Sequence, residues 1–412
     1  MMITKLLGTA MMALLAVNAM GKDVNDISKN FSPRLATPRI APIGKEGRTP
    51  DQEKMLASRP DYNIYKTLAH DPELYARWSG LGQYLLNRST LPARDREIVI
   101  LRMGWLCQAP YEWSQHARIA KADVKMTEVE VHAIAEGATA KGWNDFERTL
   151  ITMVDELRYD AMISDKTWVA LRARYSIEQT IDAIYTAAQY QLVSMALNSA
   201  GVQLDPMLQE RIPTDAALPR IAGMPHSPRL QTPRVAPLAL EAMTAEQRVL
   251  VTPQMRDGKV PNLYATLVNH VKFYEPRRRF GSYVQRDSHL PPKTRELVIL
   301  RTAWLMKAEY EWAHHVPLAK KAGLTDGEIV RIADVANTKR WSEEEWAVLS
   351  ACDELRREAF ISDVIWNRLK KYYDPQKILE IIYTSGGYAM TAIAINSLGI
   401  QVEPGNVSFP RE

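Results

Sequence analysis

Six residues of this 412-residue chain have the types and spacing needed for acid–base chemistry. The sequence Tyr-Glu-Trp-x-x-His occurs twice, and a further glutamate stands fifteen residues before each motif glutamate. The two sets are Glu97, Glu112 and His116, and Glu296, Glu311 and His315, 199 positions later. Residues four apart share one face of a helix, so the motif glutamate can raise the basicity of its histidine. We expect the earlier glutamate to pack across the same face from a preceding helix and complete an acid–base cluster.

Aromatic and basic side chains flank both clusters and are candidates for substrate binding. They are Tyr111, Trp113, Tyr310 and Trp312, and Arg96, Arg102, Arg295 and Arg301. The guanidinium groups suit an anionic small-molecule substrate. Two structural alternatives stay open. Glutamate–histidine pairs at this spacing also stabilise helices by about 0.2–0.5 kcal/mol, and pairing with a local carboxylate is the commoner role of such arginines.

Motifs of several other kinds of site are absent from the sequence. A zinc site is not expected, because neither an HExxH nor a CxxC pattern accompanies the glutamates and histidines. Glycine-rich nucleotide-binding motifs and the nucleophile elbow of serine hydrolases are also missing. The formal charge is only +4, with acidic and basic residues interspersed, so we expect no nucleic-acid partner.

Helical periodicity and helix-capping residues run through both halves, which predicts an all-α fold. Proline-punctuated segments open the halves at 32–42 and 227–237 and favour extended backbone. Because the repeat offset is near half the length, we predict two tandem domains related by internal duplication, at 32–206 and 227–405.

The N-terminus has the layout of a secretory signal peptide. Lys5 precedes an apolar run over residues 6–17, and small residues follow it. We predict a signal peptide at 1–21, cleaved after Ala19 or Gly21, and therefore an exported protein, periplasmic or secreted, without membrane contact after cleavage. An N-terminal helix that is retained is the alternative.

The two cysteines, Cys107 and Cys352, do not correspond in the repeat, because the other half carries Met306 and Val154 at these positions. Free cysteine is often a small core residue. We therefore expect buried structural thiols in preference to a redox pair.

The repeated Arg-Glu-(Ile/Leu)-Val-Ile-Leu-Arg and Tyr-Glu-Trp-x-x-His pattern resembles the carboxymuconolactone decarboxylase and alkylhydroperoxidase D superfamily. In the peroxidase branch a CxxC pair stands where this chain has Ala109 and Glu112, and both cysteines are also missing from the second half. The decarboxylase branch lacks that pair and is more similar. The resemblance implies tandem alkylhydroperoxidase D-like domains, chemistry without a metal or organic cofactor, and a homo-oligomer, a trimer-like ring of double-domain chains.

Three functions remain open at this point. The favoured one is a cofactor-independent lyase, decarboxylase-like, or an isomerase, acting on a lactone or an oxidised aromatic carboxylic acid. By the resemblance, His116 or His315 would move the proton, the motif glutamate would orient the ring, the earlier glutamate would be a second acid or base, and an arginine would hold the substrate carboxylate. The alternatives are a peroxidase-type oxidoreductase and a non-catalytic small-molecule-binding or scaffold protein.

Overall fold

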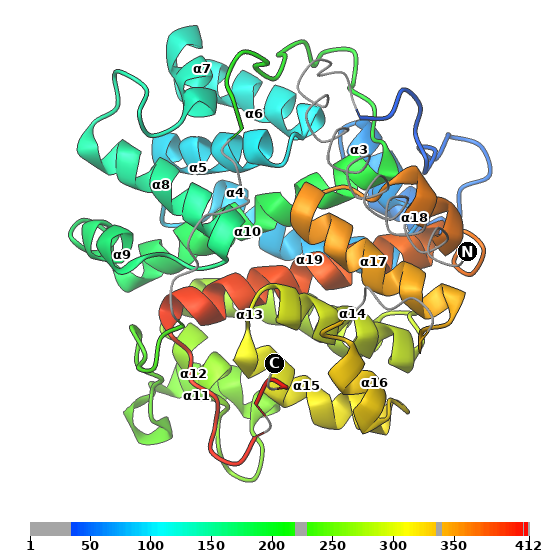
Figure 1. The fold of residues 1–412 in the computed structure, drawn as a ribbon. Coiled ribbons are helices and arrows are strands. Elements are labelled where there is room, and N and C mark those ends of the chain that lie inside the picture. The colour runs from blue at the N-terminus through cyan, green and yellow to red at the C-terminus, as the bar shows by residue number, and fades with distance from the viewer. Residues whose placement is uncertain (1–33, 219–228, 335–339, 407, 411–412) are drawn as a thin grey trace, which may run out of the picture.

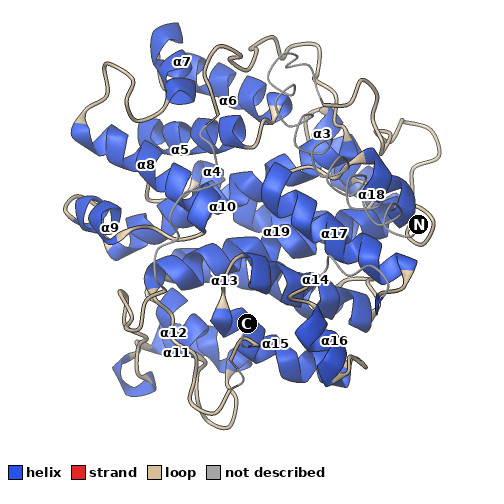
Figure 2. Ribbon diagram, in the orientation of Figure 1, coloured by secondary structure: helices blue, strands red, loops and turns tan. Residues whose placement is uncertain are grey.

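The structure, a computed structural model, describes residues 34–218, 229–334, 340–406 and 408–410. Over these ranges the chain is helical and forms no β-strand, apart from one isolated bridge between Arg256 and Lys259 (Figure 2). The all-α prediction is confirmed. The predicted signal peptide at 1–21 lies outside the described residues.

The same order of helices occurs in both halves of the chain (Figure 1). The first half contains α2 (Pro50–Ala57), α3 (Asn63–Leu68), α4 (Pro72–Asn87), α5 (Ala93–Leu106), α6 (Pro110–Ala122), α7 (Glu128–Glu136), α8 (Asp145–Asp160), α9 (Asp165–Arg172) and α10 (Ile177–Ala200). The second contains η3 (Leu240–Ala242), α11 (Ala245–Val251), η4 (Thr252–Gln254), α12 (Asn262–Leu267), α13 (Val271–Ser282), η5 (Tyr283–Asp287), α14 (Pro292–Leu305), α15 (Glu309–Lys321), α16 (Asp326–Arg331), α17 (Glu343–Glu358), α18 (Asp363–Leu369) and α19 (Pro375–Leu398).

Corresponding helices of the two halves begin and end with the same capping motifs. Asn144 and Ser342 close capping boxes at the N-termini of α8 and α17, which satisfies otherwise unpaired backbone N–H groups. Gly201 and Gly399 end α10 and α19 in the left-handed region, at φ 71° in both. A Cβ on Gly399 would lie 2.8 Å from the carbonyl oxygen of Thr232, so the close approach of the linker also requires glycine.

The two 24-residue helices α10 and α19 pack against each other in the middle of the molecule (Figure 1). A second contact between the halves joins α4 to α13. Among the described helices, α19 alone is long and apolar enough to cross a membrane, but 94% of its most apolar stretch is buried inside the protein. Its apolar surface is therefore the surface of a core helix.

Reciprocal hydrogen bonds join the ends of α8 and α17. Arg158 Nη1 donates to the carbonyl oxygen of Arg356 at 2.8 Å, and Arg356 Nη1 donates to the carbonyl oxygen of Arg158 at 2.6 Å. Each guanidinium thus satisfies carbonyl groups that a helix C-terminus leaves unpaired. The contact occurs in both directions because the two halves face each other as equivalent copies.

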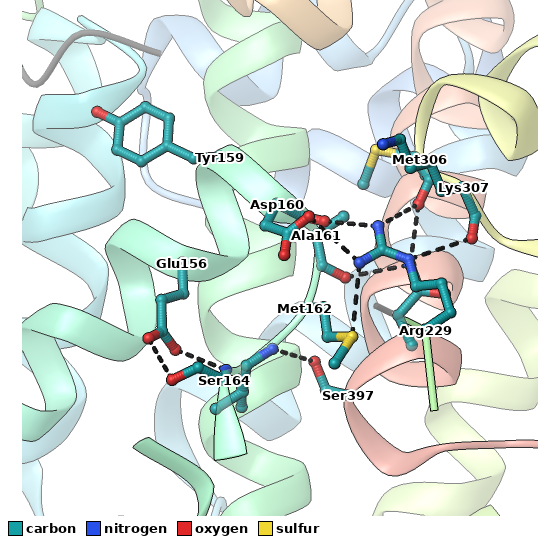
Figure 3. Close-up of polar contacts among 12 residues, drawn as sticks. Glu156, Tyr159, Asp160, Ala161, Met162, Ser164, Arg229, Met306, Lys307 and Ser397 are labelled. Atoms are coloured by element: carbon teal, nitrogen blue, oxygen red, sulfur yellow. Dashed lines mark hydrogen bonds and ion pairs between the residues drawn. The ribbon is translucent and has the colours of Figure 1, made fainter. Parts of the chain in front are cut away.

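The linker into the second half is anchored at the same junction (Figure 3). Arg229 donates to the carbonyl oxygens of Asp160 at 2.8 Å and Met306 at 3.2 Å, and so connects the end of α8 with the end of α14. Arg34, its counterpart in the first linker, donates to the carbonyl oxygen of Cys107 at 3.4 Å. The contacts of Arg229 therefore join the two halves, whereas that of Arg34 lies within the first half.

Candidate functional site

In each half, the histidine of the motif is buried and paired with the earlier glutamate. His116 Nδ1 on α6 lies 2.7 Å from Glu97 Oε2 on α5, and His315 Nδ1 on α15 lies 2.8 Å from Glu296 Oε2 on α14. The two helices of each pair pack side by side, which places residues 19 positions apart in direct contact. The structure thus brings these predicted residues together. It also assigns the orienting contact at Nδ1 to the earlier glutamate.

The ring of His116 is enclosed on both sides by carboxylates. Its Nε2 lies 3.1 Å from Glu112 Oε1, so both ring nitrogens have partners. Burial disfavours the charged ring, but the charge of Glu97 and hydrogen bonds to both glutamates outweigh it and raise the pKa of His116 to about 9. The first-half cluster is therefore a closed ion-pair network.

The equivalent glutamate of the second half has entirely different surroundings. Glu311 is buried, and neither of its carboxyl oxygens has a hydrogen-bond partner among the described residues. Burial raises the pKa of Glu311 well above its usual range, and the nearby Arg277 offsets this only in part. The surroundings of Glu311 thus favour the neutral carboxylic acid over the carboxylate. A carboxylic acid of this kind is able to donate a proton.

A cavity of about 680 Å³ adjoins the second cluster. Residues of α12, α13, α15 and α19 and of the segment after α19 line it, including Glu311, His315 and Tyr388. The ring of Tyr388 meets that of His315 edge to face, with 5.0 Å between centroids. The volume falls in the range of ordinary small-molecule sites. The second cluster therefore has both the acid–base groups and the space for a substrate.

Comparison with known families agrees with the repeat. The model of the carboxymuconolactone decarboxylase family matches residues 72–153 and 272–354, and each match contains one histidine–glutamate pair. The chain carries two tandem carboxymuconolactone decarboxylase-family domains. The matches run from α4 into α8 and from α13 into α17, so the long helices α10 and α19 lie outside them. No curated protein matches the chain.

The aromatic residues predicted to bind substrate differ in their placement within these family domains. Trp113 and Trp312 are core residues, each with 1% of its surface exposed. The hydroxyl of Tyr111 donates to Asp205 Oδ2 at 2.5 Å. Tyr310 alone of the four lines the cavity, where its hydroxyl donates to Glu403 at 3.2 Å.

The arginines predicted to bind substrate are correspondingly engaged elsewhere. Arg102 donates through Nε and Nη2 to Asp155 at 2.7 and 3.0 Å, and Arg301 bonds Asp353 in the same way at 2.6 and 2.9 Å. Both also donate to two main-chain carbonyls. We therefore correct the substrate-binding role predicted for Arg102 and Arg301, because four hydrogen bonds from each guanidinium join segments within its own domain.

The other two predicted arginines lie at the edges of the clusters. Arg96 Nε donates to Glu97 Oε1 at 3.2 Å, so it adds a positive charge to the closed first-domain cluster. Arg295 Nη1 donates to the carbonyl oxygen of Arg286 at 3.4 Å. Neither lines the second-domain cavity.

Sequence reasoning missed the cationic and imidazole groups that do line the cavity. Arg277 on α13 is one, and His314 is another, with Nε2 2.6 Å from Glu403 Oε2. The motif pattern was centred on α14 and α15, whereas Arg277 comes from the preceding helix. A position-by-position comparison of the two copies could have found it, because Trp78 stands at the equivalent position.

Both thiols of the chain are buried, as predicted. Cys107 and Cys352 are 0% and 1% exposed and are not joined to each other. Burial raises the pKa of both thiols, that of Cys352 to about 12. Because the thiolate is the nucleophile in peroxide reduction, neither cysteine has the environment of a reactive one.

Proposed function

We propose that the second domain is an acid–base catalyst that decarboxylates or isomerises a lactone or an oxidised aromatic carboxylic acid without a cofactor. One observation carries the proposal. Glu311, whose carboxyl has no hydrogen-bond partner among the described residues, and the His315–Glu296 pair line or adjoin one cavity of about 680 Å³. A carboxyl group and an imidazole that border the same cavity are able to act as acid and base in proton transfer. Membership of the decarboxylase family supports the class of reaction.

In the decarboxylation, the bond between the substrate carbon and its carboxylate breaks, and carbon dioxide leaves. The electron pair of that bond passes into the conjugated carbonyl group and forms an enolate. Glu311 then donates its proton to the carbon, and water returns a proton to Glu311. Donors that stabilise the enolate oxygen lower the barrier, because negative charge develops there.

In the isomerisation, His315 removes a proton from the carbon next to the carbonyl group. Its Nε2 is the nitrogen available for this, because Nδ1 is paired with Glu296. Glu311 donates a proton to the far carbon, and the double bond moves with no change in composition. Transfer of one proton from His315 to Glu311 restores both groups.

A panel of lactone acids and conjugated keto acids tests the proposal. Substrate loss is followed by ultraviolet absorbance, and carbon dioxide is trapped in parallel, so that decarboxylation and isomerisation are separated. We expect His315→Ala to lower kcat by about 10²-fold or more, while the matched His116→Ala variant stays active. Full activity in His315→Ala excludes the proposed site, and no turnover by the wild type favours a binding protein.

We also propose that the mature protein is exported and forms rings of double-domain chains. The signal-like sequence of residues 1–21 supports export, and the family resemblance supports the ring. N-terminal sequencing of the mature protein is expected to begin at Met20 or Lys22. Light scattering is expected to give the mass of a trimer, and a monomer would exclude the ring.

A further inference from the structure

We propose that Arg277 is the carboxylate-binding group of the second-domain cavity, and that Trp78 closes the equivalent place in the first domain. The chain then has a single anion site for its two family domains. The importance of this site rests on the proposed function, but the test below measures binding and is independent of turnover.

Trp78 and Arg277 occupy the same position of the repeat. Helices α4 and α13 follow the N-cap residues Asp71 and His270, which are 199 positions apart, the offset that also relates the two histidine motifs. Both side chains are buried, with 7% of each residue exposed. One copy of the domain therefore buries an indole at a position where the other buries a guanidinium.

The charge of Arg277 has no counter-ion within the described part of the protein. Its Nη2 donates to the hydroxyl of Thr391 at 3.0 Å, and no described carboxylate forms an ion pair with it. The neighbouring carboxyl, Glu311, forms no ion pair with it, and burial raises the pKa of Glu311 and favours its neutral form. Buried charges are normally paired, because the cost of removing an ion from water is large. An anionic ligand in the cavity supplies the missing partner.

The first domain contributes a second polar group next to Arg277. Tyr185 lies on α10, is fully buried, and its hydroxyl has no hydrogen-bond partner among the described residues. The charge of Arg277 acts on this hydroxyl and opposes the rise in the pKa of Tyr185 that burial causes. We assign Tyr185 as a positioning residue, because its hydroxyl interacts electrostatically with the guanidinium across the domain boundary. The second-domain site is therefore incomplete without the first domain.

In the first domain the equivalent place is filled. The ring of Trp78 meets that of Tyr383, the counterpart of Tyr185, edge to face at 5.4 Å between centroids. An indole offers one N–H and no positive charge, so it does not bind a carboxylate as a guanidinium does. Both nitrogens of His116 are also occupied by glutamates. The first domain thus serves as a support for the second.

Titration calorimetry with benzoate tests the proposal, with benzyl alcohol as the neutral control of similar shape. We expect the full-length protein to bind one benzoate per chain. Arg277→Met is expected to weaken benzoate binding at least about tenfold, as for loss of a charge-assisted contact, and to leave binding of benzyl alcohol unchanged. Arg295→Met is the matched control and is expected to bind benzoate as the wild type does.

Two further variants separate a binding role from a folding role. Arg277→Met is expected to raise the melting temperature of the ligand-free protein, because it removes a buried unpaired charge. Tyr185→Phe is expected to weaken benzoate binding a few-fold without affecting benzyl alcohol. Wild-type affinity in Arg277→Met, two benzoates per chain with Trp78 intact, or no binding of millimolar benzoate overturns the proposal.

Failure of the anion site can be distinguished experimentally from failure of the proposed reaction. Glu311→Gln is expected to retain benzoate binding, because the charge that attracts the ligand is that of Arg277. If Arg277→Met loses benzoate binding while the wild type turns over no substrate, the anion site is supported and the proposed reaction is excluded. If turnover depends on Glu311 and Arg277→Met binds benzoate with wild-type affinity, the proposed reaction is supported and the anion site is excluded.

Discussion

Glu112 and Glu311 occupy the same position of the two domains but have opposite electrostatic environments. Glu112 Oε1 lies 3.1 Å from the Nε2 of His116, whereas neither oxygen of Glu311 has a partner among the described residues. The local sequence around both is Tyr-Glu-Trp. The difference therefore arises from the helices packed against them, and it separates a structural ion pair from a candidate acid.

The effect of removing each carboxyl on stability is expected to differ in sign. Glu112→Gln breaks a buried pair with a protonated histidine and is expected to cost about 1–3 kcal/mol of unfolding free energy. Glu311→Gln replaces an unpartnered buried acid and is expected to melt at or above the wild-type temperature. Thermal denaturation of both variants at pH 8 checks this, and equal destabilisation would contradict the assignment of Glu311.

The His116 network is expected to make stability depend on pH in a defined window. The folded-state pKa of His116, about 9, lies above its ordinary value of 6.5, so the stabilisation is fully present below pH 6.5 and is lost as the pH rises through 9. Relative to His116→Gln, the wild type is expected to lose up to about 3 kcal/mol over this window. Urea denaturation at pH 6, 7.5 and 9 measures the difference, and a constant difference would exclude the network.

The buried thiols are expected to be inert in the native protein. Iodoacetamide should modify Cys107 and Cys352 slowly until the chain unfolds, because both are buried with raised pKa values. The Cys107→Ser, Cys352→Ser double variant is expected to keep any activity that the wild type has. Loss of activity in a folded double variant would favour the peroxidase alternative.

Much of the fold and part of the site could be predicted from the sequence, because local rules determine them. Helix caps, the 199-residue repeat and the spacing of Glu97 to His116 are all short-range features. They were sufficient to predict an all-α fold and the contact between that glutamate and histidine.

The other features of the site depend on contacts between residues that are distant in sequence. Arg102 was expected to face a substrate, but its partner Asp155 lies 53 residues away on α8. The role of Arg277 depends on α10 of the other domain, which contributes Tyr185. No periodicity or spacing rule predicts such pairings, because they follow from how the two copies pack.

The reciprocal arginines at the domain junction are expected to be needed for stability. Arg158→Ala or Arg356→Ala leaves buried carbonyl groups of the opposite helix end unpaired, which is expected to cost about 1–3 kcal/mol. Arg148→Ala, at a half-buried position of α8 that forms no hydrogen bond or ion pair with the described residues of the other half, is the control and is expected to change stability little. Urea denaturation compares the three variants. A stability loss confined to the control would contradict the role of the junction.

The most direct test of the central claim compares kcat for Glu311→Gln and Glu112→Gln on the same substrate, below the melting temperature of both. If the second domain is the catalyst and Glu311 is its acid, Glu311→Gln loses about 10²-fold or more, and Glu112→Gln stays within about twofold of the wild type. Equal losses in the two variants, or a loss confined to Glu112→Gln, would contradict the account.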